Sequence, residues 1–461
     1  MIKNLCLITY SWEGAGIAKR FKDSIGEGGR VLVGLIENNS DILLPSEKSA
    51  MENEGKDPNE EEGRNERLNV MKGILDVRTA QSVVDYLRTV EDKGEWFVFC
   101  DMNYTFKYAT MLSEFMPHGN FPTAFHRELE VDRNKAKEFI EENYPHVNKG
   151  KHVEFKDVAS AKKFLEKADE VYVLKGDGMD APTVVPPTDE VDAARQLLLD
   201  SLDKNAESYS AGIVLEVKLS DLIELTPEKV FYDGKPLYAS LDLENKKKYA
   251  GDVGGELTGC SQDLVFETSF NDKINKIAFP SAVDELAWKA KGLLFWDLSL
   301  LVSKRTGKIY PGEFCSNRPG WNAFLTEVDG LDIVNYFNDV VAGINPWDKP
   351  RFSASVRIFN DSEEKDVAII CPPEIEEHVA LMDAKMKDGK LVTVGYMADV
   401  AIVTGSGDTM EEAAGNCYDN AKQFLLSTKK WGYRHKGDFL DTSYPTAIPN
   451  RLDYAKEHEL I

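Results

Sequence analysis

The first hundred residues alternate short apolar runs with segments of helical spacing, and this alternation constrains the fold more than any other feature of the sequence. Residues 5–9 form an apolar run, residues 11–16 a glycine-bearing turn, and residues 17–25 carry apolar side chains at helical spacing. Further apolar runs cover residues 30–35 and 96–100. Strand–helix–strand alternation of this kind predicts a parallel α/β sheet.

The rest of the chain is predicted to be α+β, because helical segments and strands are interleaved from about residue 121 without strict alternation. The expected helices cover 133–142, 160–167, 192–202 and 409–425, and the expected strands cover 170–175, 212–219, 230–231, 237–241, 293–302, 308–313, 352–359, 367–371, 391–394 and 400–403. A proline-bounded linker is expected at 346–350. The sequence therefore predicts a multidomain α/β and α+β protein with divisions near residues 117 and 345.

One segment inside the first domain, residues 47–67, is rich in Glu, Asn, Gly and Lys and has almost no apolar side chains. Such a segment buries too little surface to order itself, so we expect a mobile acidic surface loop. A regulatory or partner-binding segment is the alternative interpretation.

Charge and cysteine content narrow the class of protein. The chain has 55 basic and 79 acidic residues, a formal charge of -24, which argues against nucleic acid and anionic membranes as partners but not against a small anionic ligand. Its six cysteines are scattered, without a Cys-x-x-Cys pair, so neither a zinc site nor a disulfide framework is expected. No apolar run suits a signal peptide or a membrane span. A cytoplasmic location is expected.

A lysine at the end of an apolar strand is the first candidate for chemistry. The strand ends at Lys175 and is followed at once by Gly176, Asp177 and Gly178. A lysine charge beside the amide groups of a glycine turn suits nucleotide phosphates. A solvated lysine at the end of a surface strand is the alternative.

A carboxylate within the next apolar strand is the second candidate. Glu216 interrupts residues 212–219 and could accept hydrogen bonds from ribose hydroxyls, while the backbone at a free edge beyond it reads a base. A half-exposed strand with its polar face outward explains the pattern equally well.

A hairpin near residue 300 carries the third candidate. Two strands joined by a turn at 305–308 place Asp297 and Glu313 near one end of the hairpin, with Asn317 and Arg318 just beyond. Carboxylate and carboxamide oxygens suit Mg²⁺, and an arginine can clamp a carboxylate or a phosphate. A hairpin with solvated charges is the alternative.

Lys246, Lys247 and Lys248 precede a glycine-rich stretch at 251–259, which favours a local anion site as much as a solvated lysine face. No histidine has metal-ligand spacing or stands beside a Ser or Cys nucleophile, and the turn at 11–16 lacks a full G-x-G-x-x-G. Metal-dependent hydrolysis, Ser–His–Asp chemistry and dinucleotide binding therefore find no support.

Taken in order, these motifs resemble the phosphoribosylamine–glycine ligase family of the ATP-grasp superfamily. The resemblance rests on VYVLKGDG (171–178), on KKKYAGDVGGELTG (246–259), and most specifically on VAIVTGSGDTMEEAAGNCYDNAKQF (400–424) followed by YRHKGDF. It implies an N-terminal α/β domain (1–117), an ATP-grasp domain (118–345, with a lid subdomain at about 121–205) and a small C-terminal α+β domain (346–461). Asp408 or Thr409 would also be a good N-cap for the helix expected at 409–425.

The resemblance also implies a role for each candidate residue. ATP would be held by Arg133, Lys175, Gly176, Asp177, Gly178, Glu216, Val217, Leu219, Glu224 and Lys246. Mg²⁺, with Mn²⁺ as an alternative, would be held by Asp297, Glu313 and Asn317. The expected catalytic residues are Arg318, which would face the carboxylate substrate, and Lys248. The implied reaction joins a glycine-like carboxylate to a small amine through an acyl phosphate, in a monomer or homodimer.

Several motifs depart from the family pattern. SWEGAGIA replaces the family's Gly-Gly-Arg-Glu-His-Ala turn, and the metal strand reads EFCSNRPGW instead of Glu-Phe-Asn-Cys-Arg-Phe-Gly-Asp. Asn317 is favoured over Cys315 as metal ligand because a thiol is a poor ligand for Mg²⁺. These changes favour a diverged ligase. A nucleotide-binding protein without catalysis, or an ATP-grasp ligase of another branch, remains open as an alternative.

Overall fold

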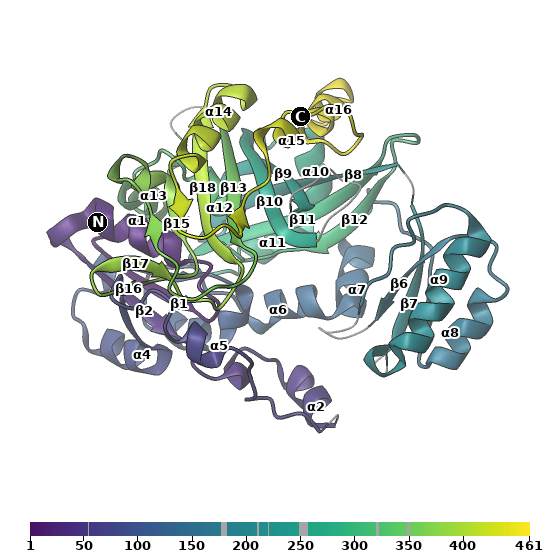
Figure 1. Cartoon of the computed structure of the whole chain (residues 1–461), viewed down its shortest axis with the longest axis horizontal. Helices are drawn as coiled ribbons and strands as arrows, with labels where there is room; N and C mark the ends of the chain where they lie inside the picture. The colour runs from purple at the N-terminus through teal and green to yellow at the C-terminus, as the bar shows by residue number, and fades with distance from the viewer. Residues whose placement is uncertain are drawn as a thin grey trace. The chain divides into compact units, whose positions relative to one another are not determined.

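The computed structural model of the 461-residue chain divides into two compact units (Figure 1). The first comprises Met1–Arg127, Leu225–Leu298 and Cys315–Ile461, and the second comprises Glu128–Glu224 and Ser299–Phe314. The structure describes residues 1–53, 55–176, 182–209, 212–219, 221–248, 257–319, 322–347 and 351–461. Within them no helix is long and apolar enough to cross a bilayer. The three-domain division stays a prediction, and residues 348–350 of the expected linker lie outside the described part.

The first unit begins with the predicted parallel sheet. Its strands are β1 (Asn4–Thr9), β2 (Arg30–Leu35), β3 (Asp76–Thr79) and β4 (Trp96–Cys100), in the order β3-β2-β1-β4. β1 pairs in parallel with both β2 and β4, and β2 pairs in parallel with β3. The alternation of apolar runs and helices is therefore confirmed as a parallel α/β fold.

Both faces of this sheet are buried, as parallel sheets require. On one face α4 (Ala80–Thr89) and α5 (Phe106–Ser113) cover a core that includes Cys6, Ile8 and Val98. On the other face, Phe97 packs 4.4 Å from Phe337 of α13 (Ile333–Val341), measured between ring centroids. The helix α1 (Ala15–Ile25) lies against α13 on that face.

A second, antiparallel sheet lies largely in the first unit. In the strand order of the sheet, the strands that enter this unit are β11, β8, β9, β10, β13, β18 and β15. They span Leu293–Ser303, Leu222–Tyr232, Lys235–Lys247, Leu257–Thr268, Phe352–Asn360, Asp399–Gly407 and Val379–Leu381 respectively. β8 and β11 extend into both units. The parallel and antiparallel sheets together confirm the predicted mixed class.

The C-terminal helix predicted from 409 begins as its sequence indicates. α14 (Met410–Ala421) packs on β13 and β18, and its N-cap is Thr409, whose hydroxyl accepts the backbone N–H of Glu412 at 3.2 Å. Glu411 and Glu412 lie in the first turn, where a carboxylate interacts favourably with the helix dipole. The N-cap is therefore Thr409, one of the two expected candidates.

The second unit has its own small antiparallel sheet. β5 (His152–Phe155), β7 (Ile213–Val217) and β6 (Tyr172–Gly176) pair in the order β5-β7-β6. The helices α8 (Val158–Leu165) and α9 (Val191–Lys204) bury Leu165 and Leu198 with Leu174 and Leu215 of the sheet. The predicted strands at 170–175 and 212–219 are thus confirmed, within the described residues, as neighbours.

The segment at 47–67 differs from the expected loop, because helices α2 (Pro45–Asn53) and α3 (Arg64–Arg67) occupy parts of it. Arg67 is fully buried and ion-paired with Glu61, so a charged side chain supplies the order that apolar residues do not. The mobility of the segment stays a prediction.

The remaining helices and strands complete the two units. Their bounds are α6 (Ala124–Val131), α7 (Arg133–Asn143), α10 (Lys273–Ala278), α11 (Ser281–Ala287), α12 (Asn322–Glu327), α15 (Lys436–Phe439), α16 (Ile448–Glu457), β12 (Ile309–Phe314), β14 (Ile369–Ile370), β16 (Ala384–Lys387), β17 (Lys390–Thr393), β19 (Leu425–Leu426) and β20 (Trp431–Gly432).

Candidate active site

In the second unit, the structure brings together the two residues predicted to hold the nucleotide. Lys175 is on β6 and Glu216 on β7, and the register pairs Val173 with Glu216, so Lys175 is a diagonal neighbour on the same face. The Lys175 ammonium lies 2.5 Å from Oε2 of Glu216. Lys137 of α7 lies 3.1 Å from the other oxygen, Oε1. Glu216 is thus held between two cations.

The two lysines control the charge of this carboxylate. Burial by itself would raise the pKa of Glu216, but the charges and hydrogen bonds of Lys175 and then Lys137 outweigh it, and the pKa is lowered. Glu216 therefore stays ionised to a lower pH than an ordinary glutamate does. The sequence interpretation did not include Lys137, although it stands one helical turn after Arg133, the residue chosen as the second phosphate cation.

The other predicted nucleotide residues are placed as follows. Gly176 ends β6, Val217 ends β7, and Leu219 follows two residues later. Glu224 is the third residue of β8. The side chain of Arg133, at the start of α7, is not among the described ones, and Asp177 and Gly178 lie outside the described residues.

The backbone of β7 is not a free edge. β7 is the central strand of its sheet, and the N–H of Val217 donates to the carbonyl of Lys151 at 2.9 Å. The N–H of Lys218 donates to the carbonyl of Val171 at 2.7 Å. Any base recognition by main-chain groups here must therefore involve groups after Lys218.

The predicted metal ligands belong to different units. Glu313 is an exposed residue of β12 in the second unit, and its N–H donates to the Ser299 hydroxyl at 2.8 Å. Asp297 and Asn317 belong to the first unit. Asn317 is 1% exposed, has a positive φ of 55° and accepts a hydrogen bond from the Asn120 amide at 3.5 Å. That these three residues form one metal site stays a prediction.

Asp297 of β11, itself half-buried, lies among carboxylates that the sequence interpretation missed, of which Asp242 is buried and Glu228 half-buried. Burial, and then the charges of Asp263, Glu244 and Asp297, raise the pKa of Asp242 well above its ordinary value. Burial, and then Glu327 and Asp297, do the same to the pKa of Glu228. Asp297 therefore stands in a region with more negative charge than its described surroundings can hold ionised.

Part of this group of carboxylates could have been predicted from the sequence of β9. Ser240, Asp242 and Glu244 alternate along it at a spacing of two, which places them on one face. Ser240 donates to Glu327, which also accepts from the Tyr238 hydroxyl at 3.1 Å. Burial raises the pKa of Glu327 to about 7.

A mixed thiol–carboxylate group continues this buried polar face. Glu244, Cys260 and Asp263 each offer a ligand atom, and the three atoms lie within 4.8 Å of one another. The register places Asp263 directly opposite Glu244 on β10 and β9. Burial raises the pKa of the Cys260 thiol well above its ordinary value, so the thiolate, which is the metal-binding form, is disfavoured.

The two predicted catalytic residues have different surroundings. Lys248 has a side chain only 10% exposed and pairs with Asp361 at 2.7 Å, over the ring of Phe359. Arg318 is partly buried, with Nη1 3.9 Å from the Cys315 sulfur. Lys246, the predicted ATP contact, lies 3.7 Å from Glu244. Lys248 is therefore already neutralised by a carboxylate, while Lys246 lies beside the acidic face.

The fold is similar to that of several solved enzymes. Phosphoribosylamine–glycine ligase of Thermotoga maritima matches 94% of this chain and 99% of its own at a TM-score of 0.61 and 17% identity. The biotin carboxylase domain of the 2-oxoglutarate carboxylase of Hydrogenobacter thermophilus, in complex with MgADP, ADP and bicarbonate, matches 99% of this chain and 98% of its own (TM-score 0.57, 13% identity). An L-amino acid ligase of Bacillus licheniformis matches 94% of this chain and 99% of its own (TM-score 0.50, 14% identity).

Neither a protein-family model nor a curated protein matches the sequence. The solved structures nevertheless match nearly the whole chain. The resemblance to phosphoribosylamine–glycine ligases and other ATP-grasp enzymes is therefore confirmed for the fold, at identities too low to extend to substrates.

Proposed function

We propose that this protein is an ATP-dependent carboxylate–amine ligase that uses Mg²⁺. Its substrates would be a small glycine-like carboxylate and a small amine, joined as an amide. The fold it shares with ligases and a carboxylase supports ATP-dependent activation of a carboxylate. The described residues support an ATP site more directly than they support any one amine.

The observation that carries the proposal is the pair of lysines around Glu216. In a chain of charge -24, two ammonium groups that converge on one carboxylate from β6 and α7 form a local cationic site. A triphosphate offers these lysines more negative charge than Glu216 does. On nucleotide binding, Lys175 and Lys137 would contact phosphates, and Glu216 would be released to accept from the ribose hydroxyls.

The proposed reaction has two steps. A carboxylate oxygen of the first substrate attacks the γ-phosphorus of ATP, the bond to the β,γ-bridging oxygen breaks, and ADP leaves. The amine nitrogen then attacks the acyl carbon of the acyl phosphate, inorganic phosphate leaves, and the nitrogen loses a proton. The protein's task is to position the groups and to neutralise phosphate charge, with Lys175 at the nucleotide and Arg318 at the carboxylate.

The residues present fit a hard divalent cation. Asp297, Glu313 and Asn317 offer only oxygen donors, and the raised pKa values of Asp242 and Glu228 beside Asp297 mark an excess of carboxylate there. Bound Mg²⁺ would neutralise charge on the transferred phosphoryl group. Cys315 does not fit this role, because thiolates select softer metals.

The test is ADP formation by the full chain with Mg-ATP and a panel of carboxylates and amines. We expect ADP only when a carboxylate is present, and amide only when an amine is added. Lys175→Met should abolish both, whereas Lys162→Met, a lysine of the same unit that pairs with Asp203, should not.

Other outcomes distinguish the alternatives. ATP binding that is unchanged in Glu313→Gln, with no ADP from any substrate pair, would identify a nucleotide-binding protein without catalysis. ADP formed with glycine only when phosphoribosylamine is present would establish the activity of the family it resembles, and a place in purine synthesis. ADP and an acyl phosphate from a carboxylate, with no amide formed from any amine of the panel, would indicate another branch of the superfamily.

A further inference from the structure

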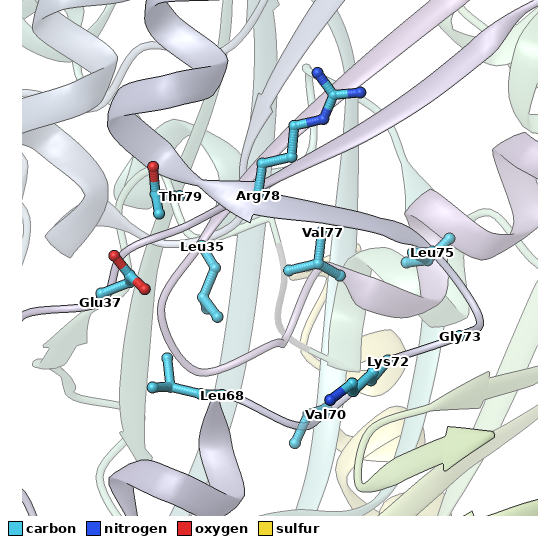
Figure 2. Close-up of a pocket in the computed structure, with 10 residues that line it drawn as sticks. All are labelled: Leu35, Glu37, Leu68, Val70, Lys72, Gly73, Leu75, Val77, Arg78 and Thr79. Carbon is cyan, nitrogen blue, oxygen red and sulfur yellow. The ribbon is translucent and has the colours of Figure 1, made fainter. Parts of the chain in front are cut away.

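A cavity of about 360 Å³ opens at one edge of the parallel sheet, far along the chain from every residue assigned to the ligase reaction (Figure 2). Its apolar lining comes from Leu35, Leu68, Val70, Leu75 and Val77. Figure 2 shows Leu35 and Val77 pointing toward Leu68 and Val70, with Glu37 and Thr79 together at one side and Lys72 at the other. A volume of this size is at the lower end of the range for small-molecule sites.

The cavity lies at the carboxyl ends of two parallel strands. β2 ends at Leu35 and β3 ends at Thr79, and both residues line it. In open parallel α/β sheets, ligands bind beyond the carboxyl ends of the strands. The point where the strand order reverses lies between β1 and β4, so the cavity is at the ligand-binding end of the sheet but beside that point.

Glu37 gives this position a chemical preference. It stands two residues after the end of β2, about 20 residues after the glycine turn, where nucleotide-binding sheets carry the carboxylate that accepts from ribose hydroxyls. Its carboxylate makes no hydrogen bond or ion pair with the described residues, and the side chain is half-buried. Arg78, the nearest guanidinium of the lining, is instead paired with Asp76 at 2.7 Å and points away from the cavity in Figure 2.

The outer wall of the cavity is held in place by a buried cation. Arg67 precedes the wall residue Leu68 and donates to the carbonyl oxygens of Ile36 at 2.8 Å and Glu37 at 3.1 Å. It also pairs with Glu61. The wall is thus tied to the end of β2 by hydrogen bonds of a fully buried side chain, so the site is preformed.

The start of the nearby helix α1 is disfavoured as a phosphate site, because a carboxylate already lies there. The N–H of Gly14, at the start of α1, donates to Oδ2 of Asp101 at 3.0 Å, and the N–H of Ala15 donates to the carbonyl of Trp12. The N–H of Trp12 donates to the Thr9 hydroxyl at 2.8 Å. In a dinucleotide site the N–H groups at such a helix start face a diphosphate, but here these three are already bonded, and the Asp101 carboxylate would repel an added phosphate.

We propose that this cavity binds an uncharged ribonucleoside, with the base between Leu35, Val77 and the wall, and the 2′- and 3′-hydroxyls donating to Glu37. The apolar lining suits a planar base, the Glu37 carboxylate suits a diol, and the Asp101 carboxylate at the start of α1 disfavours the phosphates of a dinucleotide. The site is separate from the proposed ATP site, and its occupancy does not depend on ligase activity.

The experiment is equilibrium dialysis of the full chain with radiolabelled adenosine and guanosine, while a non-hydrolysable ATP analogue saturates the proposed ATP site. We expect one nucleoside per chain, loss of binding for the 2′,3′-dideoxy analogue, and at least about a 10-fold weaker affinity for Glu37→Gln, since a hydrogen bond to a charged acceptor is lost. Val77→Trp, which fills the cavity, should abolish binding.

Matched controls separate this site from others. Glu91→Gln changes an exposed carboxylate of the same unit and should leave nucleoside binding unchanged, and Glu37→Gln should leave ADP formation unchanged. Equal binding of ribo- and dideoxynucleosides, or affinity unchanged by both Glu37→Gln and Val77→Trp, would overturn the proposal. Binding of nothing but an amino acid or another small zwitterion would overturn it as well.

Discussion

Lys175 and Glu216 are diagonal neighbours on adjacent antiparallel strands, and their charged groups lie 2.5 Å apart. Two separate sequence motifs, one expected to hold phosphate and the other ribose, thus meet in one ion pair. Lys137 completes it from a helix that neither motif includes. A nucleotide phosphate could therefore take the place of the Glu216 carboxylate beside these lysines.

We predict that Lys175→Met weakens ATP binding by about 10- to 100-fold, because a charge-assisted hydrogen bond to phosphate is lost. Lys137→Met should have a smaller effect of the same sign, since its ammonium is farther from Glu216. Calorimetric titration with a non-hydrolysable ATP analogue measures both. Lys162→Met is the control, and an unchanged affinity in Lys175→Met would contradict the assignment.

Acidification should weaken the same pairing. The pKa of Glu216 is lowered in the folded protein, so its contribution to stability is present above the pKa of the unfolded chain and is lost as pH falls through the folded value. We expect the urea midpoint of wild type to fall more steeply with decreasing pH, below the ordinary range of glutamate, than that of Glu216→Gln. Parallel curves for the two proteins would show that the ion pair contributes no stability.

Glu327 should give the opposite pH dependence. Burial raises its pKa to about 7, so its contribution is fully present below the unfolded pKa and is lost as pH rises through about 7. Glu327→Gln, which keeps the shape, should be more stable than wild type at pH above this value by about 1–3 kcal/mol. Urea denaturation between pH 5 and 8 tests this, with Glu91→Gln as control. An equal pH slope in Glu327→Gln and wild type would contradict it.

Local rules predicted much of the secondary structure. The apolar run that ends at Lys175 forms β6, in which buried and half-buried residues alternate and a glycine follows the lysine. Thr409 caps α14 because its hydroxyl can reach the N–H of Glu412. Both outcomes depend on residues within a few positions of each other. The strand and helix pattern of the parallel sheet has the same local origin.

Contacts set by distant parts of the chain could not be predicted in this way. Lys137 reaches Glu216 only through the packing of α7 in its unit, and Asp263 lies opposite Glu244 only because of the β9–β10 register. Arg67 orders its segment by reaching Glu61 and the end of β2, which a low apolar content does not indicate. A single sequence gives the spacing of residues along the chain, whereas these contacts depend on which distant strands and helices pack against each other.

The buried Arg67 provides the last prediction. Its side chain is 0% exposed and its partner Glu61 is 10% exposed, and removing one member of a buried pair leaves the other charge uncompensated. We expect Arg67→Ala to lower the free energy of unfolding by about 3–5 kcal/mol, and Arg64→Ala, three residues earlier on the exposed side of α3, to change it by less than about 0.5 kcal/mol. Urea denaturation at neutral pH measures both. A loss in Arg67→Ala no larger than that in Arg64→Ala would show that the segment 61–67 is not held by this pair, and the preformed wall of the cavity would then lose its anchor.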